Sequence, residues 1–200
     1  MIRTRRIVNA FLGTVLCAAS VQALPQDTDT SGCARIWREL PYFCNGASKA
    51  RNEGSWELYL TGISYHGRST YTAEKIHELN ENAAGSGFGK RYEEPGGNRT
   101  HLLYAVGFQD SHYKPEWMTG YAWITYWRPS PASDLRAGLG VSAFITLRTD
   151  YDHYLLPVPG LVPIGEIAVD RVSIMATYVP RLSVHKGNGD VLFIFARISF

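Results

Sequence analysis

Three side chains in this sequence have the types that acyl transfer requires. His66 ends one strand-like stretch, and Asp110 and Ser111 end another. If successive strands run in opposite directions, the ends of the first and third strands lie on the same rim. A histidine there can act as general base or acid, an aspartate can set its tautomer, and a serine can be a nucleophile or an oxyanion donor. A solvated turn without chemistry is the alternative.

Signatures of other chemistries are missing from the sequence. There is no Gly-x-Ser-x-Gly elbow, no His-Glu-x-x-His pair and no dinucleotide-binding fingerprint. Neither Cys33 nor Cys44 has a histidine at metal-ligand spacing, so we expect no metal and no organic cofactor. Both cysteines belong to a chain that we expect to be exported, where disulfides form. Export favours a disulfide between them, but if both lie on one helical segment, eleven residues along that helix are too long a distance to bridge. Their pairing therefore stays open.

The elements that must position these side chains read as β-strands. Stretches rich in aromatic and β-branched residues are separated by Gly, Pro, Asn and Asp, with strong turn signals at 95–98 and 187–190. Before them, apolar residues around Trp37 predict one short amphipathic helix, which Pro41 ends or kinks. A helical turn or two is expected within 73–79. We count eight strands, at roughly 56–66, 85–93, 99–110, 118–128, 136–149, 162–170, 172–181 and 189–200.

The first residues predict export. Three arginines precede an apolar run over 7–19, and a small-x-small cleavage signal follows at 21–23. We therefore expect a cleaved signal peptide at 1–23, an N-terminal tail with an amphipathic periplasmic helix at 24–54, and a barrel at 55–200. The chain has 20 basic and 18 acidic residues, and loss of three arginines leaves it nearly neutral. This balance argues against a nucleic-acid partner.

The last strand favours an outer-membrane barrel. The even-numbered positions from Leu192 to Phe200 form one apolar face, whereas the other face changes from apolar at Phe193 to polar at Arg197. Outer-membrane barrels consist of such alternating segments of about 10 residues. We therefore predict an all-β protein, an eight-stranded antiparallel transmembrane β-barrel with a short N-terminal amphipathic helix, in the bacterial outer membrane. A soluble periplasmic carrier of an apolar ligand is the alternative fold assignment.

Part of the barrel interior is predicted to be apolar. The strands at 99–110 and 118–128 are apolar on both faces, unlike those of water-filled porins. An eight-stranded barrel is just wide enough to be filled by side chains or to hold one slender ligand. Small residues such as Gly107, Gly120 and Ala122 favour a cavity shaped for a hydrocarbon chain over a packed interior.

Four stretches together are specific for a known family: LYLTGISYH at 58–66, YAVGFQDS at 104–111, GYAW at 120–123 and GNGDVLF at 187–193. They resemble the PagP family of outer-membrane lipid A palmitoyltransferases, over about residues 34–200. The resemblance implies an eight-stranded barrel with an N-terminal amphipathic helix. It also implies an enzyme that moves a fatty acyl chain from the sn-1 position of a phospholipid to a hydroxyacyl chain of lipid A.

The same resemblance implies roles for individual residues. His66, Asp110 and Ser111 match essential positions at the extracellular rim of the family barrel. Lys75 matches a position linked to recognition of the lipopolysaccharide acceptor, and a lysine there suits the phosphates of lipid A as a point charge. We therefore take the first three residues as catalytic candidates and Lys75 as the candidate for acceptor recognition.

In the barrel wall and at the floor of the cavity, some residues match the family pattern and others differ from it. Pro163 and Pro180 match prolines associated with lateral phospholipid access, and a strand proline lacks a ladder donor. By contrast, Thr61 and Ala83 stand where prolines would flank the acceptor-side opening, which puts that route in question. Ala122 stands where family members commonly have the glycine that forms the acyl-pocket floor. Its methyl group is expected to raise the floor and favour a chain shorter than palmitoyl.

The predicted function is therefore an outer-membrane acyltransferase. It moves a palmitoyl or somewhat shorter chain from the sn-1 position of a glycerophospholipid to the hydroxyacyl chain on the proximal glucosamine of lipid A. The expected partners are the phospholipid donor, the lipid A or lipopolysaccharide acceptor and the bilayer, with the protein a monomer or a homodimer. The alternative is a non-enzymatic small barrel that serves adhesion or envelope integrity.

Overall fold

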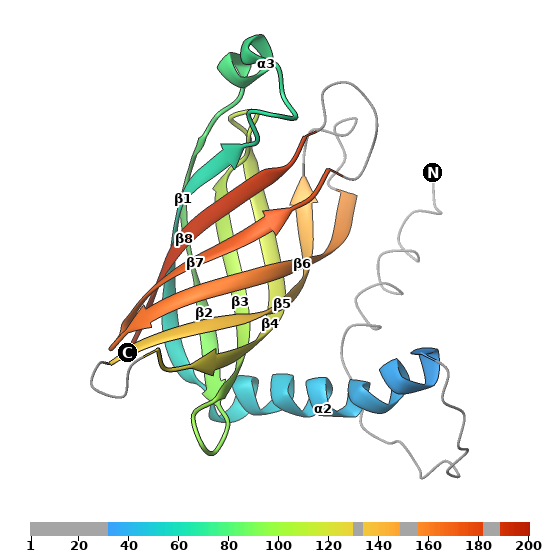
Figure 1. The fold of residues 1–200 in the computed structure, drawn as a ribbon, viewed down its shortest axis with the longest axis vertical. Helices are drawn as coiled ribbons and strands as arrows, with labels where there is room; N and C mark the ends of the chain where they lie inside the picture. The colour runs from blue at the N-terminus through green and yellow to red at the C-terminus, as the bar shows by residue number, and fades with distance from the viewer. Residues whose placement is uncertain (1–31, 130–133, 149–155, 182–188) are drawn as a thin grey trace, which may run out of the picture. The chain divides into compact units, whose positions relative to one another are not determined.

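The fold is a closed β-barrel (Figure 1). The computed structural model describes residues 32–129, 134–148, 156–181 and 189–200. The expected signal peptide at 1–23 and residues 187–188 of the predicted turn therefore lie outside the described residues, as does the side chain of Cys33. All eight predicted strands are present: β1 (Ser55–His66), β2 (Asn82–Glu93), β3 (Arg99–Gln109), β4 (Pro115–Trp127), β5 (Leu135–Arg148), β6 (Leu156–Val169), β7 (Val172–Val179) and β8 (Val191–Ser199).

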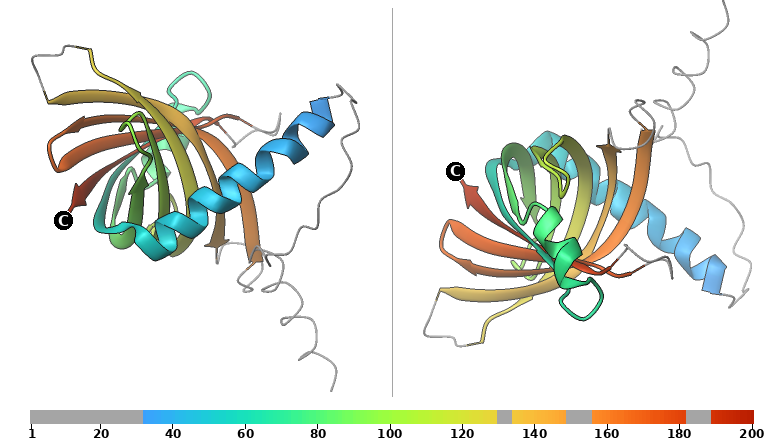
Figure 2. Two further views of the ribbon diagram at one scale, coloured as in Figure 1. Left: turned by 90° about the horizontal axis from the view of Figure 1, so that it is seen from below. Right: turned by 90° about the horizontal axis from the view of Figure 1, so that it is seen from above.

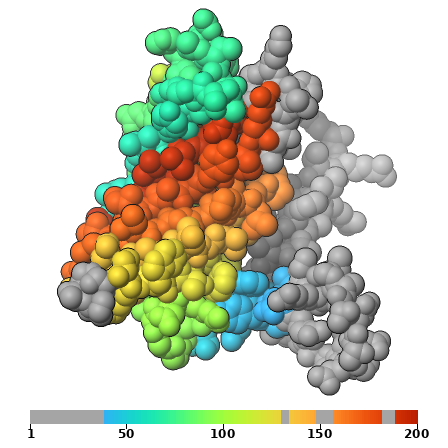
Figure 3. All heavy atoms as spheres, in the orientation of Figure 1, coloured from blue at the N-terminus to red at the C-terminus, as the bar shows by residue number. Residues whose placement is uncertain are grey.

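Every strand pairs antiparallel with its neighbours in chain order, and β8 pairs with β1 to close the barrel. Views from the two ends show the ring of strands (Figure 2). In the face drawn in Figure 3, β7 and β8 run diagonally across the wall, orange to red. The predicted eight-stranded antiparallel barrel is confirmed. The ends of β1 and β3 share one rim, called here the His66 rim, as alternating strand directions require.

The outside of the barrel is apolar. Large side chains such as Phe88, Trp117, Leu139 and Leu161 point outward and are 60% to 72% exposed. Their neighbours along the strands point inward, because successive side chains of a strand alternate between its two faces. Exposed apolar side chains on most strands of a closed sheet are typical of a barrel in a hydrocarbon environment.

Two helices differ in how well the sequence predicted them. The α3 helix (Ala73–Glu78) is the expected helical turn, capped by the Thr72 side chain. The α2 helix (Gly32–Glu53) is longer than expected: it continues through Pro41, so an end at that proline is wrong. Alanine, lysine and arginine at 47–51 have high helix propensity and extend it. No helix in the described ranges is long and apolar enough to cross a membrane.

The β6 strand begins at Leu156, earlier than the predicted start at 162. Its early part contains Pro157 and Pro159, although proline is uncommon in paired strands because it lacks an N–H donor. This part pairs only with β5, whereas the pairing with β7 begins at Ile164. The hydroxyl of Thr177 on β7 donates to the backbone carbonyl of Pro163, so the backbone N and C=O groups of odd-numbered β6 residues point toward β7. The N–H groups that Pro157 and Pro159 lack would therefore also point toward β7, with which this part of β6 forms no hydrogen-bond ladder.

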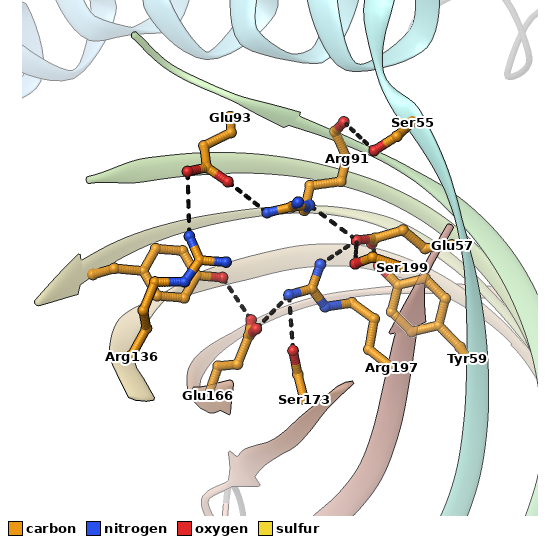
Figure 4. A network of polar contacts seen from close by, with 11 residues as sticks. Ser55, Glu57, Tyr59, Arg91, Glu93, Arg136, Glu166, Ser173, Arg197 and Ser199 are labelled. Atoms are coloured by element: carbon orange, nitrogen blue, oxygen red, sulfur yellow. Dashed lines mark hydrogen bonds and ion pairs between the residues drawn. The ribbon is translucent and has the colours of Figure 1, made fainter. Parts of the chain in front are cut away.

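A buried network of charges fills the barrel at the end opposite the His66 rim (Figure 4). Arg197 lies between Glu57 and Glu166 and forms ion pairs with both. Tyr59 donates to Glu57 at 3.1 Å, and Tyr126 donates to Glu166 at 2.7 Å. Buried charges persist only when they are paired and hydrogen-bonded, so these side chains close the lower interior as a unit.

Candidate active site

A β-bulge in β1 orients His66. Up to Thr61 the inward-facing residues of β1 are odd-numbered, but after the bulge Ser64 and His66 face inward instead. The register against β8 shifts between Thr61 and Ile63, so two residues there oppose one on the partner strand. A bulge re-aims the side chains that follow it. Without it, strict alternation would turn the His66 ring toward the outside of the barrel.

The structure brings His66 and Ser111 together. His66 Nε2 lies 2.9 Å from Ser111 Oγ, and the histidine is only 1% exposed. The carboxylate of Asp110 supports the turn that presents Ser111, because its Oδ1 accepts the backbone N–H groups of His112 and Lys114, both at 2.8 Å. The proximity of the three predicted residues at one rim therefore follows from β1 and β3 ending together.

Asn80, which the sequence analysis did not single out, fastens this turn. Its backbone N–H donates to the carbonyl of Ser111 at 2.9 Å, and its side-chain amide donates to the carbonyl of Asp110 at 3.2 Å. Asn80 is buried and lies between α3 and β2. It thereby joins the segment after α3 to the turn between β3 and β4, which holds Ser111 beside His66.

Glu81 is a second residue that the sequence analysis missed. Its Oε1 accepts the backbone N–H of His66 at 3.1 Å and lies 3.5 Å from His66 Nδ1. Arg68 binds both carboxylate oxygens, at 2.6 and 2.8 Å, and also donates to the carbonyl of His66 at 2.9 Å. Hydrogen bonds from Arg68 lower the pKa of Glu81 from 4.5 to about 2. The carboxylate beside His66 is therefore ionised at any physiological pH.

An apolar cavity of about 380 Å³ lies next to the His66–Ser111 pair. It reaches Asp110 and Ser111 at the His66 rim, and its other lining residues are mostly apolar. The residues that line it farthest from that rim include Tyr59, Leu102, Ala122, Ile164 and Met175. From Leu102 to Asp110 the lining runs roughly 25 Å along β3, or roughly 20 Å along the barrel axis at the usual tilt. The predicted apolar cavity is present, and Ala122 is one of its lining residues.

The cavity borders the place where β6 and β7 separate. Its lining includes Pro159 and Val162 of β6, together with Val179 and Pro180 at the end of β7. The ladder between these two strands stops at Ile164, one residue after Pro163. The structure thus places the two predicted access prolines on opposite sides of an unpaired stretch of wall.

The predicted acceptor-side residues lie on β1, on β2 and on the segment that joins them. Lys75 lies on α3, is 38% exposed and forms an ion pair with Glu78 at 3.0 Å. Where β1 and β2 lose register, the Thr61 hydroxyl donates to the carbonyl of Ala83 at 2.6 Å. Thr61 and Ala83 stand where the expected prolines would flank an acceptor-side opening. The bond between them instead links β1 to β2 at this part of the wall.

Comparison with known proteins identifies the family of the chain. The family model described as "Antimicrobial peptide resistance and lipid A acylation protein PagP" matches residues 47–197. The chain belongs to the PagP family. A relative named "Lipid A acyltransferase PagP" from Legionella pneumophila subsp. pneumophila strain Philadelphia 1 is 38% identical over 188 residues, 93% of this chain and 95% of its own.

Other PagP relatives agree. Proteins of the same printed name from Laribacter hongkongensis and Bordetella pertussis are 41% and 39% identical, over 71% and 78% of this chain and 65% and 82% of theirs. The resemblance drawn from four short motifs is therefore confirmed. The PagP match includes the bulge in β1, the His66–Ser111 pair and the strands that line the cavity.

Proposed function

We propose that the protein is an outer-membrane acyltransferase that modifies lipid A. It moves a palmitoyl or somewhat shorter chain from the sn-1 position of a glycerophospholipid to the hydroxyacyl chain on the proximal glucosamine. One observation carries the proposal: an apolar cavity reaches Ser111, whose hydroxyl is hydrogen-bonded to His66. Membership of the PagP family supports the choice of lipid A as acceptor.

The geometry supports a base-assisted acyl transfer. His66 Nε2 takes the proton of the attacking hydroxyl while that oxygen forms a bond to the sn-1 carbonyl carbon. The bond between the carbonyl carbon and the sn-1 oxygen of the glycerol then breaks, and this glycerol oxygen receives the proton from His66. The attacking oxygen belongs either to lipid A directly or first to Ser111, which lies 2.9 Å from the base. In the second route the lipid A hydroxyl then attacks the Ser111 ester, His66 takes the proton of that hydroxyl, and Ser111 Oγ receives it as the ester bond to serine breaks. An acyl adduct on Ser111, sought by intact-protein mass spectrometry with donor alone, distinguishes the two routes.

The barrel wall supports entry of the donor from the bilayer. The apolar exterior suits a membrane environment, and the cavity reaches the unpaired wall next to Pro163 and Pro180. A tail that enters there is buried in the cavity, with its ester near Ser111. Lys75, exposed on α3, then offers a positive charge to the phosphates of lipid A.

Mass spectrometry of lipid A tests the proposed function. Cells that express the protein should gain one non-hydroxylated acyl group per lipid A, and cells that express His66→Ala should not. Both proteins should show heat-modifiable gel mobility, which controls for insertion of a folded barrel. Unchanged lipid A in the presence of folded wild-type barrel would favour the non-enzymatic barrel, and release with the periplasm would favour a soluble carrier.

A further inference from the structure

We propose that Glu81 is the acidic partner of His66, positioned by Arg68, and that it holds the imidazole with Nε2 toward the reacting hydroxyl. This inference rests on the acyltransferase function proposed above and names a positioning residue for the same site. Glu81 is not one of the residues that line the cavity, and its carboxylate lies beside the His66 ring, so it acts through the histidine.

The geometry places one partner at each nitrogen of the ring. Nε2 is 2.9 Å from Ser111 Oγ, and Nδ1 is 3.5 Å from Glu81 Oε1. Among the described residues, buried Nδ1 has no partner within hydrogen-bond geometry, so Glu81 is the acceptor within reach. Catalytic hydrogen bonds are often long in a free enzyme and shorten once substrate is bound. A movement of roughly half an ångström completes the bond.

Arg68 fixes the carboxylate in that position. Its guanidinium donates to both oxygens of Glu81 and to the backbone carbonyl of His66, so the three residues form one ring of contacts. A bidentate arginine–carboxylate pair sets orientation as well as charge. The Glu81 backbone carbonyl also accepts the N–H of Ser64, which anchors the segment to β1.

The charge of Glu81 has a definite function in catalysis. When His66 takes a proton, Nδ1–H faces the Glu81 carboxylate, which stabilises the imidazolium and keeps Nδ1 as the protonated nitrogen in the neutral ring. Arg68, Tyr71 against the ring face, and His112 on the β3–β4 turn also face His66. On the same turn, the carboxylate of Asp110 accepts the backbone N–H groups of His112 and Lys114, whereas the carboxylate of Glu81 lies beside His66 Nδ1.

The test compares wild type with Glu81→Gln and Glu81→Asp in acyl transfer from phospholipid to lipid A in detergent. Glu81→Gln keeps an oxygen acceptor for the His66 backbone but removes the charge. It should lower kcat by about 10²-fold with little change in KM. The acid limb of its pH–rate profile should move to lower pH, because a protonated ring loses its stabilising charge. Glu81→Asp should recover a large part of the activity.

Controls separate the two proposals. Glu74→Gln makes the same change at an exposed position of α3 and should leave the rate and the pH profile unchanged. Heat-modifiable mobility establishes that each variant is a folded barrel. If Glu81→Gln keeps wild-type kcat and pH profile while His66→Ala is inactive, the positioning role is refuted and the acyltransferase stands. If folded wild type transfers no acyl chain, the proposed function itself fails.

Discussion

Replacing Ala122 by glycine tests how the cavity selects chain length. Ala122 is fully buried on β4, opposite Leu102 of β3 and Ser142 of β5, and its side chain lines the cavity. Removal of its methyl group should lengthen the space available to the terminal carbons of the acyl chain. The preferred chain should therefore become longer by one or two methylene groups.

The size of this effect follows from burial and overlap. Each additional buried methylene contributes about 0.8 kcal/mol, and relief of steric overlap in a filled core contributes about 1–3 kcal/mol. A combined change of about 2 kcal/mol or more corresponds to about 30-fold or more in the ratio of kcat/KM for the longer and shorter donors.

The assay is competition between saturated phospholipid donors that differ by two methylene groups, with products resolved by mass spectrometry of lipid A. Ala143→Gly is the matched control, since Ala143 lies on β5 with its side chain exposed on the outside of the barrel. It should leave the product ratio unchanged. Identical product ratios for wild type and Ala122→Gly would refute the assignment of Ala122 to the pocket floor.

Four further predictions concern the wall, the acceptor, the lower interior and pH. Pro163→Ala supplies an N–H donor toward β7, and one new hydrogen bond of about 0.5–1.5 kcal/mol should slow donor entry by about 2–10-fold, measured as kcat/KM for phospholipid. Lys75→Ala should raise KM for lipid A with little change in KM for the phospholipid donor; an unchanged KM for lipid A would remove its recognition role. Arg197→Met removes the cation that buried Glu57 and Glu166 share and leaves Glu57 with Arg91 alone, so it should destabilise the barrel by about 3–5 kcal/mol in denaturant unfolding. Because Arg68 lowers the pKa of Glu81 from 4.5 to about 2, the stability difference between wild type and Glu81→Gln should be constant above pH 4.5 and disappear as the pH falls to about 2; persistence of that difference at the acidic end would contradict the ion pair.

The strand pattern was predictable because each strand carries its own signal. Aromatic and β-branched residues alternate between Gly- and Pro-containing turns, and all eight expected strands form. The start of β6 was not predictable from local rules, because proline normally excludes a paired strand. Pro157 and Pro159 are accommodated since their missing donors face an edge without a partner. Which side of β6 lacks a partner depends on where its pairing with β7 begins, and this is not encoded in the residues of β6 alone.

The site was predictable only in part. Placing His66 and Ser111 on one rim required nothing beyond alternating strand direction, and their hydrogen bond fits that prediction. Glu81 escaped notice because it precedes a strand and reaches His66 only through the return of the chain after α3. The buried charge network around Arg197 could have been predicted. Glu57 and Arg197 share the inward-facing positions of their strands with apolar residues, and a buried charge there requires a partner.

The most direct test of the central claim follows one labelled acyl chain. A phospholipid labelled only in its sn-1 chain is supplied to the purified, refolded barrel together with lipid A. Label should appear in lipid A, in proportion to the lysophospholipid released, and should not appear with His66→Ala. Label that stays in the donor, with a folded wild-type barrel, would contradict an enzyme built around this cavity.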